Sequence, residues 1–397
     1  MIAERMRRVE PSRLLDQIAL GQQMRRDGVD FVDLGPGQPD FPVPGLVLEA
    51  TAKALRDGHT YYSPVMGVAK LREAVADRYA RLYGARYSVP NVMVTAGAKG
   101  ALYHVIGAHL NEGGEVIIPS PYYVSTPEIV KLWGGTPVFL PCRPANRFLP
   151  DLEELKAMAG PATRGIVLNS PCNPTGAVIP GALLASILEF ATVRGLFVIM
   201  DECYDRYIYG GAQYATLPHV DFDPKLPFFI AGSFSKTFSM TGYRLGYAIG
   251  PGEGIAEAGK IQSHSMNGVT TFAQFGGLAA LQNEEALFAP VLEDYARRRE
   301  VILEELAKVP GLLMTDPDGA FYTFPEAAGM MERLGARSSD ELAGRLLKEA
   351  GVMVIPGSAL GSEGFLRISF AVPVEKIREA VRRIRAFMEK QEVSIKK

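Results

Sequence analysis

The sequence predicts an α/β protein in which a mostly parallel sheet, flanked by helices, is followed by a smaller α+β part. Between about residues 90 and 250, short and nearly unbroken apolar runs alternate with longer amphipathic stretches. Apolar strands separated by helices are what a parallel sheet buried on both faces requires. After about residue 284 the sequence changes to long stretches rich in Glu, Arg and Lys, which predict long helices.

The expected elements follow from these patterns. In the first region, strands are expected at Val92–Thr95, Glu115–Ile118, Gly165–Asn169, Phe197–Asp201 and Phe228–Ala231, with helices at Glu128–Trp133 and Leu183–Arg194. In the second region, helices are expected at Glu293–Lys308 and Pro373–Lys390, with strand-like pieces at Ala320–Phe324 and Phe365–Phe370.

The length of 397 residues exceeds what one compact core supports, so two domains are expected. We expect residues 1–43 to form an N-terminal arm and part of a small domain, residues 44–290 a large ligand-binding domain, and residues 291–397 the small C-terminal domain.

The composition favours small-molecule chemistry over binding to polymers or membranes. A net charge of −2 and a pI near 6.3 give no general attraction to nucleic acid or anionic lipid. Cys142, Cys172 and Cys203 are odd in number and lack a CxxC pair, so no disulfide framework and no zinc or other metal site is expected. The first residues lack a signal-peptide core, and no apolar run reaches the ~20 residues of a membrane span. A cytoplasmic protein is expected.

Polar groups follow the ends of four predicted strands. Parallel sheets bind ligands beyond the carboxyl ends of their strands, so these groups are expected to meet at one rim. They are Thr95–Lys99, Asn169–Thr175, Asp201–Tyr204 and Ser233–Lys236.

Lys236 is the first candidate for chemistry. It follows an apolar strand, and a partly buried lysine loses its proton readily enough to condense with an aldehyde. Ser233, Ser235 and Arg244 lie close in sequence and are suitable donors to a phosphate. This segment therefore points to a phosphorylated aldehyde bound as a Schiff base.

The motifs in this order resemble those of class I/II aminotransferases, which are pyridoxal 5′-phosphate (PLP) enzymes of fold type I. The similarity extends from about Val9 to about Phe387. Its S-x-S-K…R pattern implies a Schiff base at Lys236 and phosphate contacts from Ser233 and Arg244, with Ser235 the less certain serine.

The resemblance also assigns the residues around the cofactor ring. It implies that Asp201 pairs with the pyridine nitrogen, whereas without the other motifs this aspartate could equally be a helix cap. Tyr204 and Asn173 are implied to donate to the phenolic oxygen from opposite sides, and Asn173 also to contact the substrate. Outside the family pattern, the Asn173 segment would be an ordinary Asn-Pro turn.

Further matches concern the phosphate, the ring face and the substrate. The turn Gly97-Ala98-Lys99 is implied to cradle the phosphate, mainly through backbone N–H groups, and Tyr123, rather than Tyr122, to stack on the ring. Gly37 and Arg367 are implied to bind the substrate α-carboxylate. Tyr62 is implied to reach the phosphate of a neighbouring subunit, so a homodimer with shared active sites is expected.

The implied activity is ping-pong transfer of an amino group between an L-amino acid and a 2-oxo acid, with Lys236 moving the proton. Glutamate and 2-oxoglutarate are one expected pair, and aspartate or an aromatic or neutral amino acid provides the other. A second basic residue for a side-chain carboxylate would be expected at Gln262–Gly268, which holds no arginine; His264 and Asn267 are the candidates there. The alternatives are a PLP-dependent C–S β-lyase, another fold type I enzyme, and a non-catalytic PLP-binding regulator.

Overall fold

The computed structural model describes residues 2–11, 13–35, 37–217 and 226–395. Its largest feature is a seven-stranded sheet with the strand order β2-β8-β7-β6-β5-β3-β4. The strands are β2 (Val92–Thr95), β3 (Glu115–Ser120), β4 (Thr136–Pro141), β5 (Thr163–Asn169), β6 (Phe197–Asp201), β7 (Phe228–Ser233) and β8 (Gly246–Ile249).

The sheet is mostly parallel, as expected from the sequence. The pairs β3–β4, β3–β5, β5–β6 and β6–β7 are parallel, and β8 runs antiparallel to both β7 and β2. The register sets Asn169 opposite Asp201, and Asp201 opposite Ala231. The carboxyl ends of these central strands therefore lie side by side, which brings the segments that follow them to one rim.

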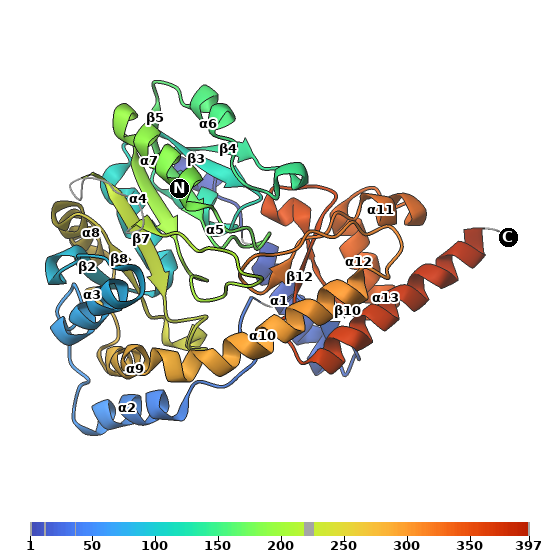
Figure 1. The fold of residues 1–397 in the computed structure, drawn as a ribbon, viewed down its shortest axis with the longest axis horizontal. Coiled ribbons are helices and arrows are strands. Elements are labelled where there is room, and N and C mark those ends of the chain that lie inside the picture. The colour runs from blue at the N-terminus through green and yellow to red at the C-terminus, as the bar shows by residue number, and fades with distance from the viewer. Residues whose placement is uncertain (1, 12, 36, 218–225, 396–397) are drawn as a thin grey trace.

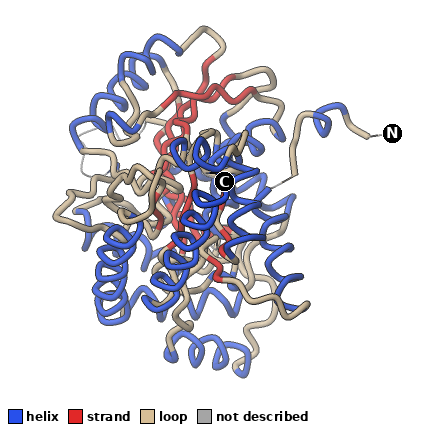
Figure 2. Tube along the Cα trace, turned by 90° about the vertical axis from the view of Figure 1, so that its right-hand side faces the viewer, coloured by secondary structure: helices blue, strands red, loops and turns tan. Residues whose placement is uncertain are grey.

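Helices cover both faces of the sheet, because successive strand residues point to opposite sides and both sides are apolar. Met93 and Ile199 belong to one core, while their neighbours Val94 and Val198 belong to the other. One face is covered by α4 (Gly97–His109), α5 (Ser125–Leu132) and α8 (Gly252–Ser265). The other is covered by α3 (Ala69–Tyr83), α6 (Leu152–Met158), α7 (Gly181–Arg194) and α9 (Thr271–Gln282). Figure 2 shows the strands running between these helical layers.

A third core lies beside the sheet and is built from short strands and long helices. The strand β1 (Val32–Asp33) pairs with β10 (Val352–Met353), and β11 (Ile355–Pro356), β12 (Leu366–Ser369) and β9 (Tyr322–Thr323) form a separate antiparallel sheet. The surrounding helices are α10 (Glu284–Leu306), α11 (Ala328–Leu334), α12 (Ser339–Ala350) and α13 (Val374–Ile395). The expected α+β architecture of this region is confirmed. The helix α10 continues without a break across residue 290, where we predict a domain boundary from the sequence.

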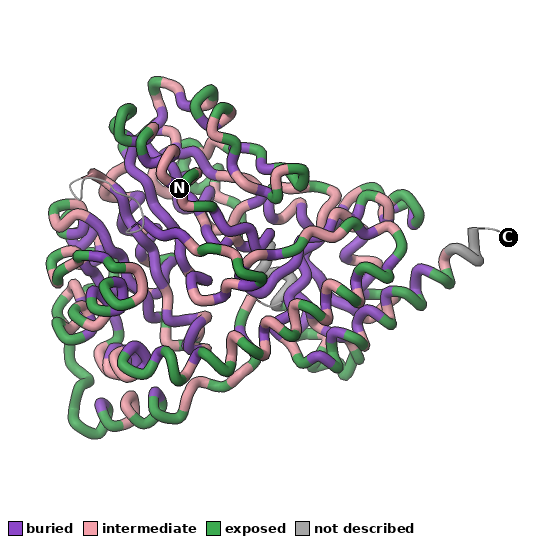
Figure 3. The backbone as a smooth tube through the Cα atoms, in the orientation of Figure 1, coloured by how far each residue is buried: buried purple, intermediate pink, exposed green. Residues whose placement is uncertain are grey.

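The remaining helices lie at the periphery. In Figure 1, α2 (Gly45–Arg56) lies below α9, and α10 runs from α9 toward α13. Figure 3 shows the sheet buried, while much of α2 is exposed. No helix in the described ranges is long and apolar enough to cross a membrane. The peripheral helices are α1 (Arg13–Arg26) and α2 (Gly45–Arg56), with short 3-10 turns at Glu4–Arg7, Val89–Asn91, Pro144–Asn146, Thr241–Tyr243 and Gly357–Leu360.

Candidate active site

A cavity of about 470 Å³ lies at the carboxyl ends of the central strands, where the sheet meets the third core. Segments far apart in the sequence contribute to its wall, as the sequence analysis expected. The predicted site residues that line it are Gly37, Gly97, Ala98, Lys99, Tyr123, Asn173, Asp201, Tyr204, Ser233, Ser235, Lys236, Arg244 and Arg367.

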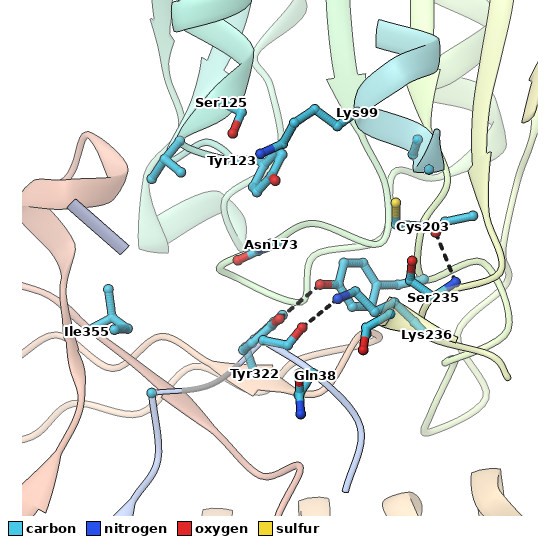
Figure 4. Close-up of a pocket in the computed structure, with 18 of the residues that line it drawn as sticks. Gln38, Lys99, Tyr123, Ser125, Asn173, Cys203, Ser235, Lys236, Tyr322 and Ile355 are labelled. Atoms are coloured by element: carbon cyan, nitrogen blue, oxygen red, sulfur yellow. Dashed lines mark hydrogen bonds between the residues drawn. The ribbon is translucent and has the colours of Figure 1, made fainter. Parts of the chain in front are cut away.

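Lys236 follows β7 and extends its amine into this cavity. Figure 4 shows the amine donating a hydrogen bond, which is the 2.5 Å contact from Nζ to the carbonyl oxygen of Gly37. Burial lowers the pKa of Lys236 to about 8, and the positive charges of Arg367 and Arg244 act in the same direction. About a tenth of the amine is therefore neutral at pH 7, far more than for an exposed lysine. A neutral amine can attack an aldehyde and accept a proton.

Asp201 is the last residue of β6 and is 5% exposed. Its Oδ1 accepts a hydrogen bond from the backbone N–H of Cys203 at 3.1 Å. Burial raises the pKa of this carboxyl group, because a charged form is poorly solvated there. Such a carboxylate is suited to hold a cationic N–H group that enters the cavity.

The N-terminus of α4 and Arg244 form an anion-binding corner. Gly97 opens the helix with φ at +71°, and a β-carbon there would lie 2.9 Å from Nη2 of Arg244. Glycine is therefore needed both for the backbone angle and for the close approach of the guanidinium group. Free N–H groups at a helix start and an arginine fork together favour a phosphate. Ser233 and Ser235 line the same cavity, and the Ser233 hydroxyl accepts from the Ser235 N–H at 3.0 Å.

Arg367 lies on β12 and is 2% exposed. Its Nη1 donates to Oδ1 of Asn173 at 3.1 Å, and its Nη2 donates to the carbonyl oxygen of Gly35 at 2.6 Å. Within the described ranges its Nε has no hydrogen-bond partner. A buried guanidinium group with a free donor, and with no acidic partner among its hydrogen bonds there, is suited to bind a carboxylate.

Tyr204 was predicted as a site residue, and Tyr322, which lines the same cavity, was not. The hydroxyl groups of Tyr204 and Tyr322 lie 2.9 Å apart, and both side chains are buried. The ring of Tyr322 lies under the guanidinium carbon of Arg367, 4.5 Å from it. Tyr322 belongs to a predicted strand and its partner strand carries Arg367, but no sequence pattern specifies that these two strands pair.

Lys99 and Tyr123 form another side of the cavity. Nζ of Lys99 lies 5.8 Å from the centre of the Tyr123 ring, and Figure 4 shows the lysine amine beside that ring. Tyr122 instead stacks on Phe139, with ring centres 4.8 Å apart, and does not line the cavity. Lys99 therefore offers its side chain to the cavity in addition to its backbone N–H.

The other predicted residues lie elsewhere. Tyr62 is 88% exposed and does not line the cavity of its own chain. His264 and Asn267, at and beyond the end of α8, do not line it either. Conversely, Arg25 and Asp33 line the cavity without having been predicted, and they form an ion pair of 2.6 Å. In the ranges described, no group of three or more His, Cys, Asp or Glu side chains is placed to hold a metal ion.

Comparison with known proteins extends over nearly the whole chain. Residues 29–384 match the family model for aminotransferase class I and II. The probable aspartate/prephenate aminotransferase of Aquifex aeolicus is 40% identical over 390 residues, which cover 98% of each chain. The aspartate aminotransferase of Geobacillus stearothermophilus is 37% identical over 98% of this chain and 99% of its own. The structure of aspartate aminotransferase from Thermus thermophilus with maleate matches with a TM-score of 0.92 and 37% identity, covering 98% of this chain and 99% of that one.

Proposed function

The chain belongs to the class I and II aminotransferases, and we propose that it transfers the amino group of a dicarboxylic L-amino acid to a 2-oxo acid through Lys236. Its function as a PLP-dependent aminotransferase follows from the family and from relatives that are similar over their full length. The observation that carries the assignment of the site is the meeting of Lys236, Asp201, Arg244 and Arg367 around one cavity.

The residues of the cavity fit PLP. When bound, this cofactor supplies an aldehyde carbon and a protonated pyridine ring that accepts the electrons released at the substrate Cα. The buried carboxylate of Asp201 suits the ring nitrogen, and the corner formed by Gly97 and Arg244 suits the phosphate. We assign the phenolic oxygen to Tyr204 and Asn173, and one ring face to Tyr123. Ser233 and the N–H groups of Ala98 and Lys99 complete the phosphate contacts.

Lys236 is assigned the proton transfer. Its lowered pKa keeps part of the amine neutral, so that Nζ can accept the proton from Cα of the amino acid. When the 2-oxo acid is converted to its amino acid, the same amine donates a proton to Cα. Arg367 holds the α-carboxylate, which fixes the orientation of the bond to be broken. The N–H group of Gly37 is the second contact assigned to that carboxylate. Asp201 keeps the ring nitrogen protonated throughout.

The preference for a dicarboxylic substrate rests on charge in the cavity. Two further basic side chains of the described residues line it: Arg25 is paired with Asp33, whereas Lys99 contacts the ring of Tyr123. Lys99 is therefore assigned to the side-chain carboxylate. Relatives named for aspartate support this choice over aromatic or neutral donors, and they support amino transfer over β-elimination.

A homodimer is proposed as the working assembly. Tyr61 and Tyr62 are 84% and 88% exposed, and Leu46, Leu48 and Leu55 of α2 are exposed nearby in the sequence. Exposed apolar side chains of this size favour contact with a second copy. Tyr62 is then assigned to the phosphate of the partner's site. A cytoplasmic location is proposed because Cys142, Cys172 and Cys203 are free thiols, which suits a reducing compartment.

The substrate assignment is tested with purified, PLP-loaded protein and a panel of amino donors in the presence of 2-oxoglutarate. Aspartate is expected to give a higher kcat/KM than alanine or phenylalanine. Lys99→Met keeps the backbone N–H and is expected to lower kcat/KM for aspartate about 10-fold or more, with little effect on phenylalanine. The exposed Lys260→Met variant is the control. Equal losses for both donors would contradict the role of Lys99, and release of ammonia and pyruvate from a cysteine conjugate without an oxo acid would favour a lyase.

A further inference from the structure

Tyr322 connects two parts of the cavity that have different tasks. Its hydroxyl group lies 2.9 Å from that of Tyr204, and its ring lies 4.5 Å from the guanidinium carbon of Arg367. The side chain is fully buried, and Figure 4 shows the hydrogen bond between its hydroxyl group and that of Tyr204, close to Lys236. One side chain thus contacts both the tyrosine assigned to the cofactor and the arginine assigned to the substrate.

The position of Tyr322 is enforced by its surroundings. A β-carbon on Gly37 would lie 2.7 Å from the Tyr322 hydroxyl, so a residue with a side chain at 37 would displace it. The pairing of Ser369 with Tyr322 and of Ile368 with Thr323 fixes β9 against the strand that carries Arg367. The contact between Tyr322 and Arg367 is therefore built into the pairing of two strands.

Once the cofactor is present, the direction of the hydrogen bond between the Tyr204 and Tyr322 hydroxyl groups is fixed. A phenol has one proton to donate, and in the structure either Tyr204 or Tyr322 can be the donor of their bond. If Tyr204 donates to the phenolic oxygen of the cofactor, the proton between the tyrosines must come from Tyr322. Donation from Tyr322 polarises Tyr204 and makes it a stronger donor, because successive hydrogen bonds reinforce one another.

We propose that Tyr322 is a positioning residue with two separable functions: its hydroxyl group strengthens the hydrogen bond from Tyr204 to the cofactor, and its ring supports the guanidinium group of Arg367. The proposal rests on the proposed assignment of Tyr204, Lys236 and Arg367. Tyr322 thereby sets the properties of Tyr204 and Arg367, which are assigned to the cofactor and to the substrate.

Tyr322→Phe tests the hydroxyl group, because the ring is kept. With a weaker donor at Tyr204, negative charge on the phenolic oxygen is less stabilised, and the Schiff-base nitrogen beside it holds its proton to higher pH. The visible absorption band of the PLP-loaded protein should therefore titrate at a pH higher than in the wild type by about half a unit. Tyr209→Phe is the matched control, because Tyr209 is a buried tyrosine outside the cavity, and its titration should match the wild type.

Tyr322→Leu tests the ring. The affinity for maleate, a non-reacting dicarboxylate, is read from the change it causes in the same absorption band. Loss of the ring should weaken maleate binding about 5-fold or more, whereas Tyr322→Phe should change it less than about 2-fold. Equal effects of Phe and Leu on maleate would show that the ring and the hydroxyl group are not separable, which overturns that part of the proposal.

The outcomes also separate this proposal from the assignment of the site. A wild-type protein that takes up PLP with a normal band, together with a Tyr322→Phe variant that titrates at the same pH, overturns the role of the Tyr322 hydroxyl alone. A wild-type protein that develops no visible band with PLP overturns both the assignment of Lys236 and the role of Tyr322. An upward shift in Tyr322→Phe with an unmoved Tyr209→Phe control supports the proposal.

Discussion

At the scale of single residues, burial gives Lys236 its reactivity. An amine in water is almost fully protonated at neutral pH, and a protonated amine neither attacks an aldehyde nor accepts a proton. In the cavity, loss of solvent lowers its pKa, while Asp201 opposes that shift with its negative charge. The balance leaves a pKa of about 8, close to the working range of a group that must give and take one proton.

This balance predicts the pH dependence of cofactor uptake. Below about pH 8 the rate at which cofactor-free protein reacts with PLP should rise about 10-fold per pH unit, and above it the rate should level off. With an unperturbed lysine, the rate would instead continue to rise up to the ordinary lysine pKa of 10.5. The measurement is stopped-flow absorbance after mixing with PLP between pH 6 and 10, and a rate that still rises steeply at pH 10 would contradict the lowered pKa.

The site residues differ in how far the sequence reveals them. Lys236, Asp201, Asn173 and Arg244 stand in motifs whose order along the chain is itself informative, and all four line the cavity. Tyr322 stands in no such motif, and its importance depends on a contact with Arg367 across two strands. Contacts of this kind follow from strand pairing, which a pattern of apolar residues does not specify.

Among the secondary-structure elements, five strands of the large sheet were predicted, including the edge strand β2, whereas β4 and β8 were not. The strands β5, β6 and β7 are continuous apolar runs buried on both sides, which is the strongest signal a short strand gives. The edge strand β4 is largely exposed and contains two prolines, which a position at the edge tolerates because fewer ladder bonds are needed. The strand β8 begins with Gly246 and is followed by Gly250, and glycine is disfavoured within strands, so its sequence gives a weak strand signal.

The start of α4 carries a prediction about cofactor affinity. Gly97→Ala places a β-carbon 2.9 Å from Nη2 of Arg244 and forces a positive φ on alanine, so PLP should bind at least about 10-fold more weakly. Gly100→Ala is the control in the same helix, since its β-carbon would lie an ordinary 3.4 Å from the Thr95 side chain. Fluorescence titration with PLP measures both, and equal affinities would contradict the phosphate corner.

Buried ion pairs connect α3, the segment after β6 and the start of α10. Arg78 of α3 lies 2.6 Å from Asp205, which follows β6, and 2.8 Å from Glu284 at the start of α10. Arg81 reaches Glu284 as well, but its side chain is 48% exposed.

These ion pairs predict unequal losses of stability. Arg78→Met removes the buried ion pair of Asp205 and leaves Glu284 with Arg81 and Arg206, so it should lower the free energy of unfolding by about 3–5 kcal/mol. Arg81→Met removes a half-exposed arginine and leaves Glu284 paired with Arg78, so it should cost about 1 kcal/mol or less. Urea unfolding followed by circular dichroism compares the two variants, and similar midpoints would contradict the structural role of Arg78.

At the scale of the whole molecule, the cavity exists because the sheet and the third core meet there. The sheet supplies Lys236 and Asp201, while the small strands supply Arg367 and Tyr322. The proposed dimer would add Tyr62 from a second copy. The division into domains at residues 1–43, 44–290 and 291–397 stays a prediction. One of its boundaries falls inside α10, which is a single helix there.

A shared site predicts complementation between two inactive variants. Tyr62→Ala and Lys236→Ala are each expected to be poorly active alone. When the two are co-expressed, a mixed dimer contains one site with an intact lysine and the partner's intact tyrosine. About a quarter of the wild-type activity should then return if subunits pair at random. A mixture that contains mixed dimers by mass spectrometry, yet is no more active than the separate variants, would contradict sharing.

The proposed bond between Lys236 and the cofactor underlies every other assignment in the site. Reduction of the PLP-loaded protein with borohydride makes that bond permanent, and peptide mass spectrometry then locates it. We predict a single phosphopyridoxyl adduct on Lys236 and a visible absorption band that disappears on reduction. Protein that stays colourless with PLP, or an adduct on Lys99 in the same cavity in place of Lys236, would contradict the account.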